Sequence, residues 1–186
     1  MGLHGLVLAG GKGARMGREK GAMLHPDGRS LVRRAVDLLR EAGCIQVVIS
    51  LRTGQIFEEK IEGVMIVRDE GEGPLGGMIA GMETEDADWL VVACDLPRLD
   101  VATLQGLLGF EDKFVSYRSE SDGLTEPLCG FYGRGALEVL RSSREMGVWE
   151  LRRILDTNGC RILELVNKRA LDNSNTIDEW IRMTGC

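Results

Sequence analysis

The sequence lacks an excess of positive charge and lacks any apolar run long enough to cross a membrane. Its 186 residues carry 23 Lys and Arg against 29 Asp and Glu, a formal net charge of −6. This balance argues against a general electrostatic grip on nucleic acid or on an anionic membrane and leaves room only for a local basic patch. The longest clean apolar run, Trp89 to Cys94, is far shorter than the roughly 20 residues of a membrane-spanning helix.

The sequence also lacks the cysteine pattern of a disulfide-bonded or zinc-binding protein. The chain has five cysteines, an odd number, and no CxxC motif. We therefore expect a reduced, cytoplasmic protein without a structural zinc site. No cationic stretch precedes the first apolar residues, so we expect no secretory signal.

Length and composition favour one globular domain that covers residues 1–186. The chain is close to the roughly 150 residues of an ordinary domain, and it is 44% hydrophobic and 28% charged, which is globular composition. No repeat, low-complexity tract or linker divides it.

Strand-like and helix-like segments alternate along the chain. Apolar runs rich in β-branched residues indicate buried strands, and apolar residues spaced three and four apart indicate helices. The predicted strands are 3–9, 45–51, 64–67, 89–94, 114–117, 128–132 and 162–166. The predicted helices are 31–42 with Ser30 as N-cap, a short one around 78–82 after a glycine-dense turn, 101–108 with Asp100 as cap, 136–140, 148–155 and 177–183.

These strands are continuously apolar, so both faces of their sheet must be covered. We therefore predict an α/β fold, a three-layer α/β/α sandwich with a mostly parallel, Rossmann-like sheet. In such sheets, ligands bind beyond the carboxyl ends of the strands.

A loop dense in glycine and positive charge follows the first strand. Gly10, Gly11 and Gly13 allow the backbone to come close to a ligand, and successive N–H groups can form an anion site. Arg15 and Lys20 add cations that suit phosphate oxygens. We favour a nucleoside triphosphate as the ligand, and a flexible turn with solvated cations is the alternative.

Two familiar phosphate-binding patterns fail in this loop. The dinucleotide pattern GxGxxG would require glycine where Met16 stands, and the P-loop pattern would require Ser or Thr after Lys20, where Gly21 stands. The failed dinucleotide pattern disfavours an oxidoreductase.

Acidic residues follow two of the predicted strands. Asp95 comes directly after the strand 89–94, and Mg²⁺, which accompanies triphosphates, usually takes only one or two carboxylates from a protein. The alternative for Asp95 is that it forms a turn or a helix cap before Pro97.

Asp69 stands at the end of the segment that contains the predicted strand 64–67. It is either a site residue or a solvated turn residue. Gly76, in the segment 74–77, either contributes to a backbone N–H cluster near the ligand or belongs to a tight turn.

Together, these motifs resemble the molybdenum cofactor guanylyltransferases, which belong to the nucleotidyltransferases with a glycosyltransferase-A-like, Rossmann-type fold. The resemblance rests on the segments 8–21, 73–77, 94–97 and 173–176, which occur in the family's order and span nearly the whole chain.

The resemblance implies transfer of GMP from GTP to the phosphate of molybdenum-bound molybdopterin, with release of pyrophosphate and Mg²⁺ as cofactor. It implies that Leu8, Ala9, Gly10, Lys20 and Asp69 contact the nucleotide, that Asp95 binds Mg²⁺, and that Asn175 assists near the metal.

In the corresponding mechanism the backbone amides from Gly10 to Gly13 hold the β- and γ-phosphates. Arg15 stabilises the leaving pyrophosphate, and Lys20 stabilises the α-phosphate. Ser50 stands where the family often has an Asn that helps hold the nucleotide, so the base preference stays open.

Two kinds of alternative stay open. One is a sibling enzyme, a molybdopterin cytidylyltransferase or a cobinamide-phosphate guanylyltransferase, and the other is a GTP-binding module that catalyses nothing. We expect no nucleic-acid or membrane partner, and the sequence does not decide between a monomer and a homodimer.

Overall fold

The computed structural model describes residues 2–10, 23–70 and 72–173. Its strands are β1 (Leu3–Leu8), β2 (Gln46–Arg52), β3 (Val64–Asp69), β4 (Asp88–Ala93), β5 (Phe114–Arg118), β6 (Thr125–Tyr132) and β7 (Arg161–Leu163). Its helices are α1 (Leu31–Glu41), α2 (Gly73–Met82), α3 (Val101–Gln105), α4 (Ala136–Glu145) and α5 (Leu151–Thr157). No helix in this part of the chain has both the length and the apolar character needed to span a bilayer.

The strands form one seven-stranded sheet in the order β3-β2-β1-β4-β6-β5-β7. Neighbours run parallel except around β6, which is antiparallel to both β4 and β5. β5 and β6 are joined by a short loop in which Ser119 N donates to Leu124 O at 2.8 Å, and a short connection of this kind forces an antiparallel pair. The predicted α/β fold with a mostly parallel sheet is confirmed.

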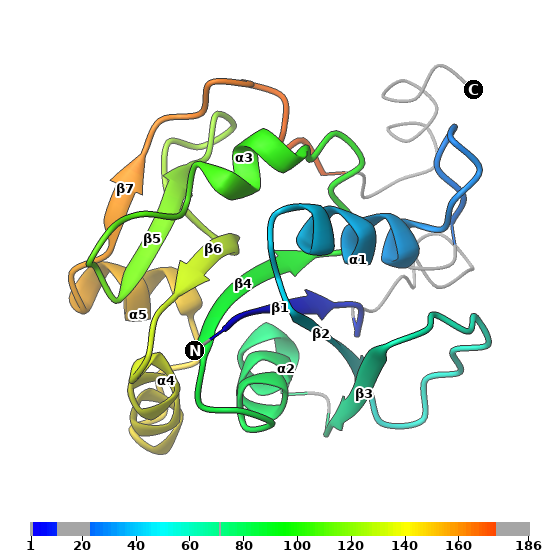
Figure 1. Ribbon diagram of the computed structural model, residues 1–186. Helices are drawn as coiled ribbons and strands as arrows, with labels where there is room; N and C mark the ends of the chain where they lie inside the picture. Colours follow the sequence, from blue (N-terminus) through cyan, green and yellow to red (C-terminus); the bar gives the residue numbers. More distant parts are fainter. Residues whose placement is uncertain (1, 11–22, 71, 174–186) are drawn as a thin grey trace.

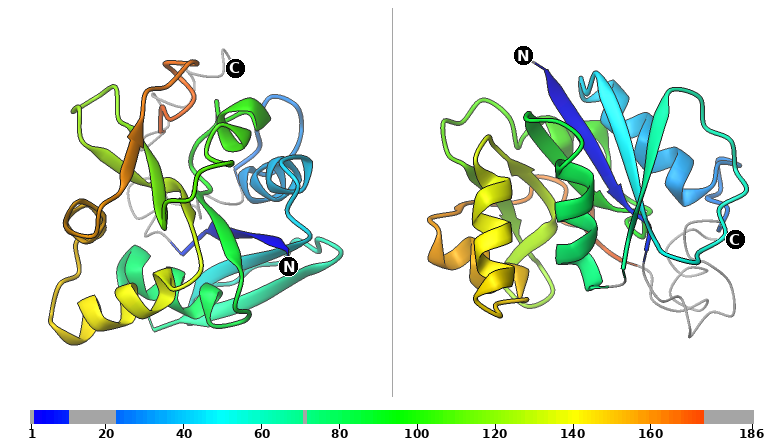
Figure 2. Two further views of the ribbon diagram at one scale, coloured as in Figure 1. Left: turned by 60° about the vertical axis from the view of Figure 1, so that its left-hand side comes forward. Right: turned by 90° about the horizontal axis from the view of Figure 1, so that it is seen from below.

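Helices cover both faces of the sheet, as Figures 1 and 2 show. α1 and α3 lie on one face of the sheet, and α2, α4 and α5 lie on the other. Each face has one apolar core between the sheet and its helices. The side chains of β2 alternate between the two cores: Val47, Ile49 and Leu51 belong to the α1 side, whereas Val48 belongs to the α2 side. The three predicted layers are therefore present.

Both predicted helix caps are observed. The Ser30 hydroxyl accepts a hydrogen bond from Arg33 N at 3.0 Å at the start of α1. The Asp100 carboxylate accepts one from Thr103 N at 2.7 Å at the start of α3. Each side chain satisfies a backbone donor that has no partner within its helix.

The start of α2 differs from the prediction. The helix begins at Gly73 rather than near residue 78, so the glycine-dense segment forms its first turns instead of a separate turn. Pro74 suits the first helical turn because it needs no backbone donor there. Gly77 lets the helix lie close to the sheet, since a Cβ at this position would lie 2.9 Å from Ser50 Oγ.

Other bounds shift at the ends of elements. β6 begins at Thr125, three residues before the predicted start, because it continues the hairpin with β5. α3 ends at Gln105, because the chain continues in tighter turns in which Leu107 N donates to Leu104 O at 3.2 Å and Leu108 N to Gln105 O at 3.1 Å. β7 covers only Arg161–Leu163, and Val166 beyond it is fully exposed. The predicted helix 177–183 lies outside the described residues.

Candidate active site

A cavity of about 440 Å³ opens at the carboxyl ends of β1, β2, β3 and β4. This is the edge at which parallel α/β sheets bind ligands. The residues that line it come from four strand ends, the start of α2 and β6: Leu8, Ala9, Gly10, Ser50, Arg52, Asp69, Gly73, Pro74, Gly77, Ala93, Cys94, Asp95 and Leu128.

The alternation of strand side chains explains which residues reach the cavity. Leu8 lies opposite Ser50 on β2 and opposite Ala93 on β4, and Arg52 lies opposite Asp69 on β3. Paired residues of parallel strands point to the same face, and every second residue along one strand does so too. One wall of the cavity is therefore formed by the last residues of these strands, on the face of the sheet that α2 covers.

Hydrogen bonds fix the backbone where β1 ends and the glycine-rich segment begins. Ala9 N donates to Ser50 O at 2.9 Å, and Cys94 N donates to Leu8 O at 3.1 Å. The Ala9 carbonyl accepts from the Gln55 side-chain amide at 2.9 Å. At Gly10 a Cβ would lie 3.1 Å from Arg52 N, closer than side chains usually pack against backbone, so glycine suits this position.

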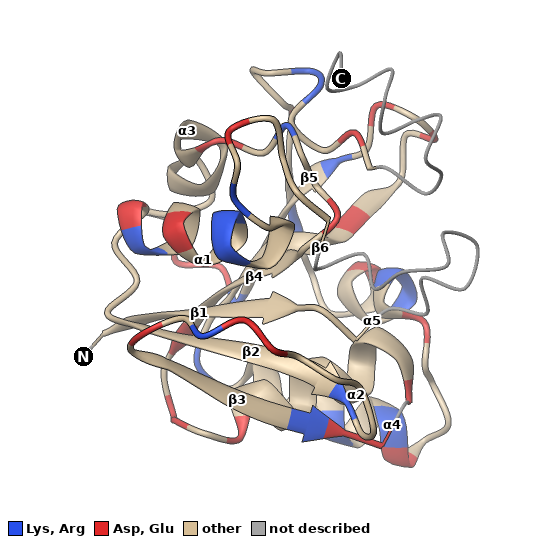
Figure 3. Ribbon diagram, turned by 90° about the vertical axis from the view of Figure 1, so that its right-hand side faces the viewer, with Lys and Arg blue, Asp and Glu red and all other residues tan. Residues whose placement is uncertain are grey.

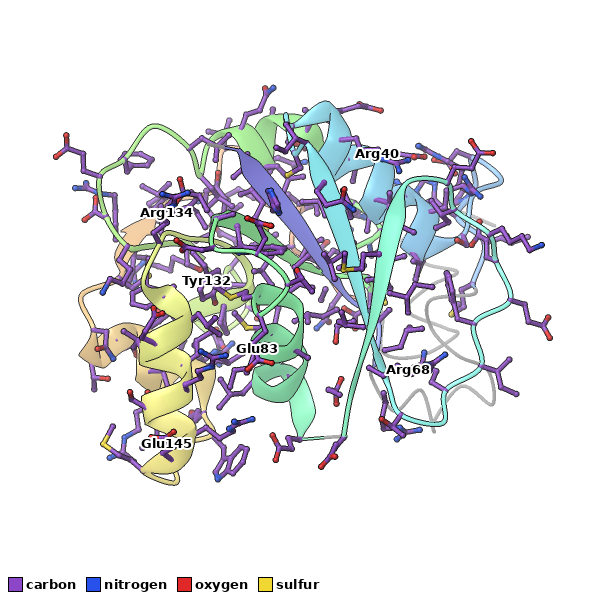
Figure 4. The ribbon with its side chains drawn as sticks, turned by 60° about the horizontal axis from the view of Figure 1, so that its bottom comes forward. Arg40, Arg68, Glu83, Tyr132, Arg134 and Glu145 are labelled. Atoms are coloured by element: carbon purple, nitrogen blue, oxygen red, sulfur yellow. The ribbon has the colours of Figure 1, made fainter. Side chains whose placement is uncertain are left out.

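The turn 52–55 connects this segment to Asp69. Gln55 N donates to Arg52 O at 3.0 Å, and the Gln55 side-chain oxygen accepts from Arg52 N at 3.2 Å. Thr53 donates twice to the Asp69 carbonyl, from its N–H and from its hydroxyl, each at 2.8 Å. Arg68, at the tip of β3 (Figure 4), donates to Gln55 O at 2.8 Å. One short turn thus holds the ends of β1, β2 and β3 together.

The carboxylates of the site differ in their surroundings. Asp69 is buried, and its Oδ2 lies 3.4 Å from the Ser50 hydroxyl. Asp95, two residues after the end of β4, is half-buried and lines the cavity. The pKa of Glu126, on β6, is raised, chiefly by burial and further by the negative charges of Asp122 and Asp95. The charge of Asp95 thus acts on Glu126, a residue that the sequence did not single out.

Comparison with known families identifies the chain. The model of the MobA-like NTP transferase domain matches residues 5–162. The chain belongs to the MobA-like NTP transferase family. This match includes β2 to β6 in full, β1 without Leu3 and His4, and β7 without Leu163.

Curated relatives of this MobA-like NTP transferase agree with the family. It is 31% identical over 192 residues to a "Probable molybdenum cofactor guanylyltransferase" of Synechococcus elongatus, covering 97% of each chain. It is 30% identical over 184 residues to a "Molybdenum cofactor biosynthesis bifunctional protein" of Synechocystis sp., covering 96% of this chain but 52% of that relative. The chain thus spans about half the length of the bifunctional protein.

A solved structure shares the fold. The molybdopterin-guanine dinucleotide biosynthesis protein A of Archaeoglobus fulgidus superimposes with a TM-score of 0.75, at 21% identity, over 98% of this chain and 97% of that one. At this identity the likeness concerns the fold.

The structure of this MobA-like NTP transferase brings six of the predicted site residues to one cavity. They are Leu8, Ala9, Gly10, Ser50, Asp69 and Asp95. Gly76 is buried in α2 and does not line the cavity, whereas Gly73 and Gly77 do. Gly11, Gly13, Arg15, Lys20 and Asn175 lie outside the described residues.

Sequence reasoning missed Arg52 and Gln55. Arg52 follows Ser50 by two positions in the same strand, so the period of a strand could have indicated that both face the cavity. Gln55 left no such signal, because its bond to Arg52 N is an ordinary turn contact and its bond to Ala9 O joins residues that only the fold brings close.

Proposed function

We propose that the protein transfers GMP from GTP to the terminal phosphate of molybdenum-bound molybdopterin and releases pyrophosphate. The observation that carries the proposal is a single cavity that joins the start of the glycine-rich segment to Asp69 and Asp95. The name of the Synechococcus elongatus relative supports a guanine nucleotide and the molybdenum cofactor as the substrate classes, and the name of the bifunctional protein supports molybdenum cofactor biosynthesis.

The residues present fit Mg²⁺. No group of three or more His, Cys, Asp or Glu side chains within 2–10, 23–70 and 72–173 is placed to hold a metal ion. Mg²⁺ needs no such group, because it usually takes one or two carboxylates and completes its shell with phosphates and water. In this proposal Asp95 holds Mg²⁺ and Asn175 assists. When bound, Mg²⁺ supplies positive charge and polarises the α-phosphate.

The protein's own groups then position two polyanions. Backbone N–H groups from Gly10 to Gly13 hold the β- and γ-phosphates, Arg15 stabilises the departing pyrophosphate, and Lys20 stabilises the charge that builds on the α-phosphate. Ser50 and Asp69 contact the nucleoside.

An acceptor phosphate oxygen forms the new bond to the α-phosphorus as the bond to the bridging β-phosphate oxygen breaks. The acceptor is already ionised near neutral pH, since the second pKa of a phosphate monoester is about 6, so no general base is required.

The proposal extends to the whole chain. Residues 1–186 act as one nucleotidyltransferase domain in the cytoplasm, as a monomer or a homodimer, with GTP and a molybdopterin-type acceptor as partners and without nucleic acid or membrane.

The test is a panel of GTP, CTP, ATP and UTP with Mg²⁺, each with and without molybdenum-bound molybdopterin. We expect pyrophosphate release and a guanine dinucleotide product, identified by mass, only when GTP and the acceptor are both present. Turnover with CTP would instead indicate the cytidylyl sibling. GTP binding without pyrophosphate release would indicate a binding module and would refute the proposed activity.

A further inference from the structure

The Arg52 residue lines the cavity, and no hydrogen bond or ion pair to another described residue holds its guanidinium there. Within the described residues, its guanidinium forms no hydrogen bond and no ion pair; only its backbone N–H and carbonyl do so. Other arginines of the protein are engaged, for example Arg33 with Glu59 at 2.7 Å and Arg141 with Glu83 at 2.8 Å. Arg52 therefore brings five donors and a full positive charge to the cavity without a structural use for them.

The place of Arg52 in the sheet indicates which part of a nucleotide it meets. It ends β2 opposite Asp69, which ends the edge strand β3. Figure 3 shows a basic and an acidic segment next to each other at the tip of β3. Asp95 follows β4, which is three strands from β3 in the order β3-β2-β1-β4. At about 4.8 Å per strand, Asp69 on β3 lies roughly 14 Å from the end of β4, and Arg52, on β2 and thus two strands away, lies roughly 10 Å from it. The proposed function places Mg²⁺ and the α-phosphate by Asp95, so the base lies toward Arg52 and Asp69.

The chemistry of this end fits guanine. Guanine presents two acceptors, O6 and N7, side by side, and an arginine fork matches that pair. On its adjacent edge guanine presents the N1–H and 2-amino donors, which a carboxylate such as Asp69 can accept. Adenine carries an amino donor where guanine carries O6, so adenine would set donor against donor at Arg52.

Resting on the proposed nucleotidyl transfer, we propose that Arg52 is a specificity-determining residue that donates to O6 and N7 of guanine. It selects GTP over ATP, a selection that the Ser50 hydroxyl alone would not make. This assigns a base preference that the exchange of Asn for Ser50 had left open.

The experiment measures nucleotide binding by calorimetry, without acceptor, so that it does not depend on turnover. The ligands are GTP, 7-deaza-GTP, which lacks only the N7 acceptor, and ATP, each with Mg²⁺. The proteins are the wild type, Arg52→Met, which keeps an apolar stem of similar length, and the control Arg161→Met. Arg161 also belongs to a strand, but to β7 at the opposite edge of the sheet, where it pairs with Asp112. Thermal unfolding without ligand checks that each variant is folded.

We expect the wild type and Arg161→Met to bind 7-deaza-GTP about tenfold more weakly than GTP, and ATP more weakly still. Arg52→Met should bind GTP and 7-deaza-GTP equally and lose most of its preference over ATP. Equal binding of GTP and 7-deaza-GTP by the wild type would overturn the inference, and so would a preference that survives in Arg52→Met. A uniform loss for all three ligands in Arg52→Met would mean a phosphate contact and would also overturn it.

The wild type alone tests the N7 contact, so the inference does not depend on the variant folding. Pyrophosphate release with the acceptor is measured separately. If that release fails while the dependence on N7 and Arg52 holds, the proposed transfer is wrong and the guanine contact stands. If the wild type binds none of the three nucleotides, both are wrong.

Discussion

Replacement of Gln55 by alanine should loosen the turn that holds three strand ends at the cavity. The Gln55 side chain is 9% exposed and makes two hydrogen bonds, to Ala9 O at 2.9 Å and from Arg52 N at 3.2 Å. Its removal leaves both backbone groups without these partners, and each unpaired buried group costs about 1–3 kcal/mol. Since water can enter part of the space, we expect a loss of about 2 kcal/mol in the free energy of unfolding. For a chain of this length that corresponds to a fall of roughly 4–8 °C in Tm.

The assay compares urea and thermal unfolding, together with GTP affinity, for Gln55→Ala and the control Gln46→Ala. Gln46 is the same residue type at the other end of β2, and its amide makes only a long contact of 3.4 Å to Val47 O. We expect the control to stay within about 0.5 kcal/mol of the wild type, as surface substitutions usually do. We also expect Gln55→Ala to weaken GTP binding, because Ala9 and Gly10 lose their support. Equal stability and equal GTP affinity in the two variants would refute this account of the turn.

Three further substitutions test other parts of the site. Gly77→Ala would place a Cβ 2.9 Å from Ser50 Oγ and 3.4 Å from Asp69 Oδ2; we expect GTP binding to weaken by about tenfold, while stability changes by less than ~1 kcal/mol because alanine favours the helix. An unchanged calorimetric affinity would show that the cavity tolerates the methyl group. Burial raises the pKa of Glu126, so its carboxyl is protonated over a wider pH range in the folded protein than in the unfolded chain. The free energy of unfolding therefore falls as the pH rises above the unfolded pKa of about 4.3. Glu126→Gln should therefore raise Tm near pH 7 in metal-free buffer, and this gain should vanish toward pH 4; a gain independent of pH would contradict the cause given. Lys20→Ala should lower turnover by roughly 100-fold with the fold intact, whereas Lys113→Ala should turn over normally, and equal rates would exclude the proposed role of Lys20.

Much of the fold followed from local patterns. Ser30 and Asp100 were predicted as helix caps because their short polar side chains can accept from the next backbone N–H groups, and both do so. The continuous apolar run of β2 predicted a strand buried on both faces, and its residues fill both cores. The place of Asp95 at the cavity also followed, because parallel strands end at the same edge of a sheet, whereas Asp69 was assigned to the site only by the family resemblance.

What could not be predicted depends on tertiary contacts. The start of α2 was misplaced because glycines normally disfavour helices, and only the close approach of Gly77 to Ser50 gives them a purpose there. The role of Gln55 depends on its bond to the Ala9 carbonyl, 46 residues away along the chain, and no local pattern encodes that pair.

The most direct test of the central claim is a crystal structure with Mn²⁺ in place of Mg²⁺ and a non-hydrolysable GTP analogue. The account predicts an anomalous metal peak at the Asp95 carboxylate and the guanine beside Asp69 and Arg52. A nucleotide found elsewhere, for example in the groove between α4 and α5 lined by Ser142 and Asn158, would contradict it.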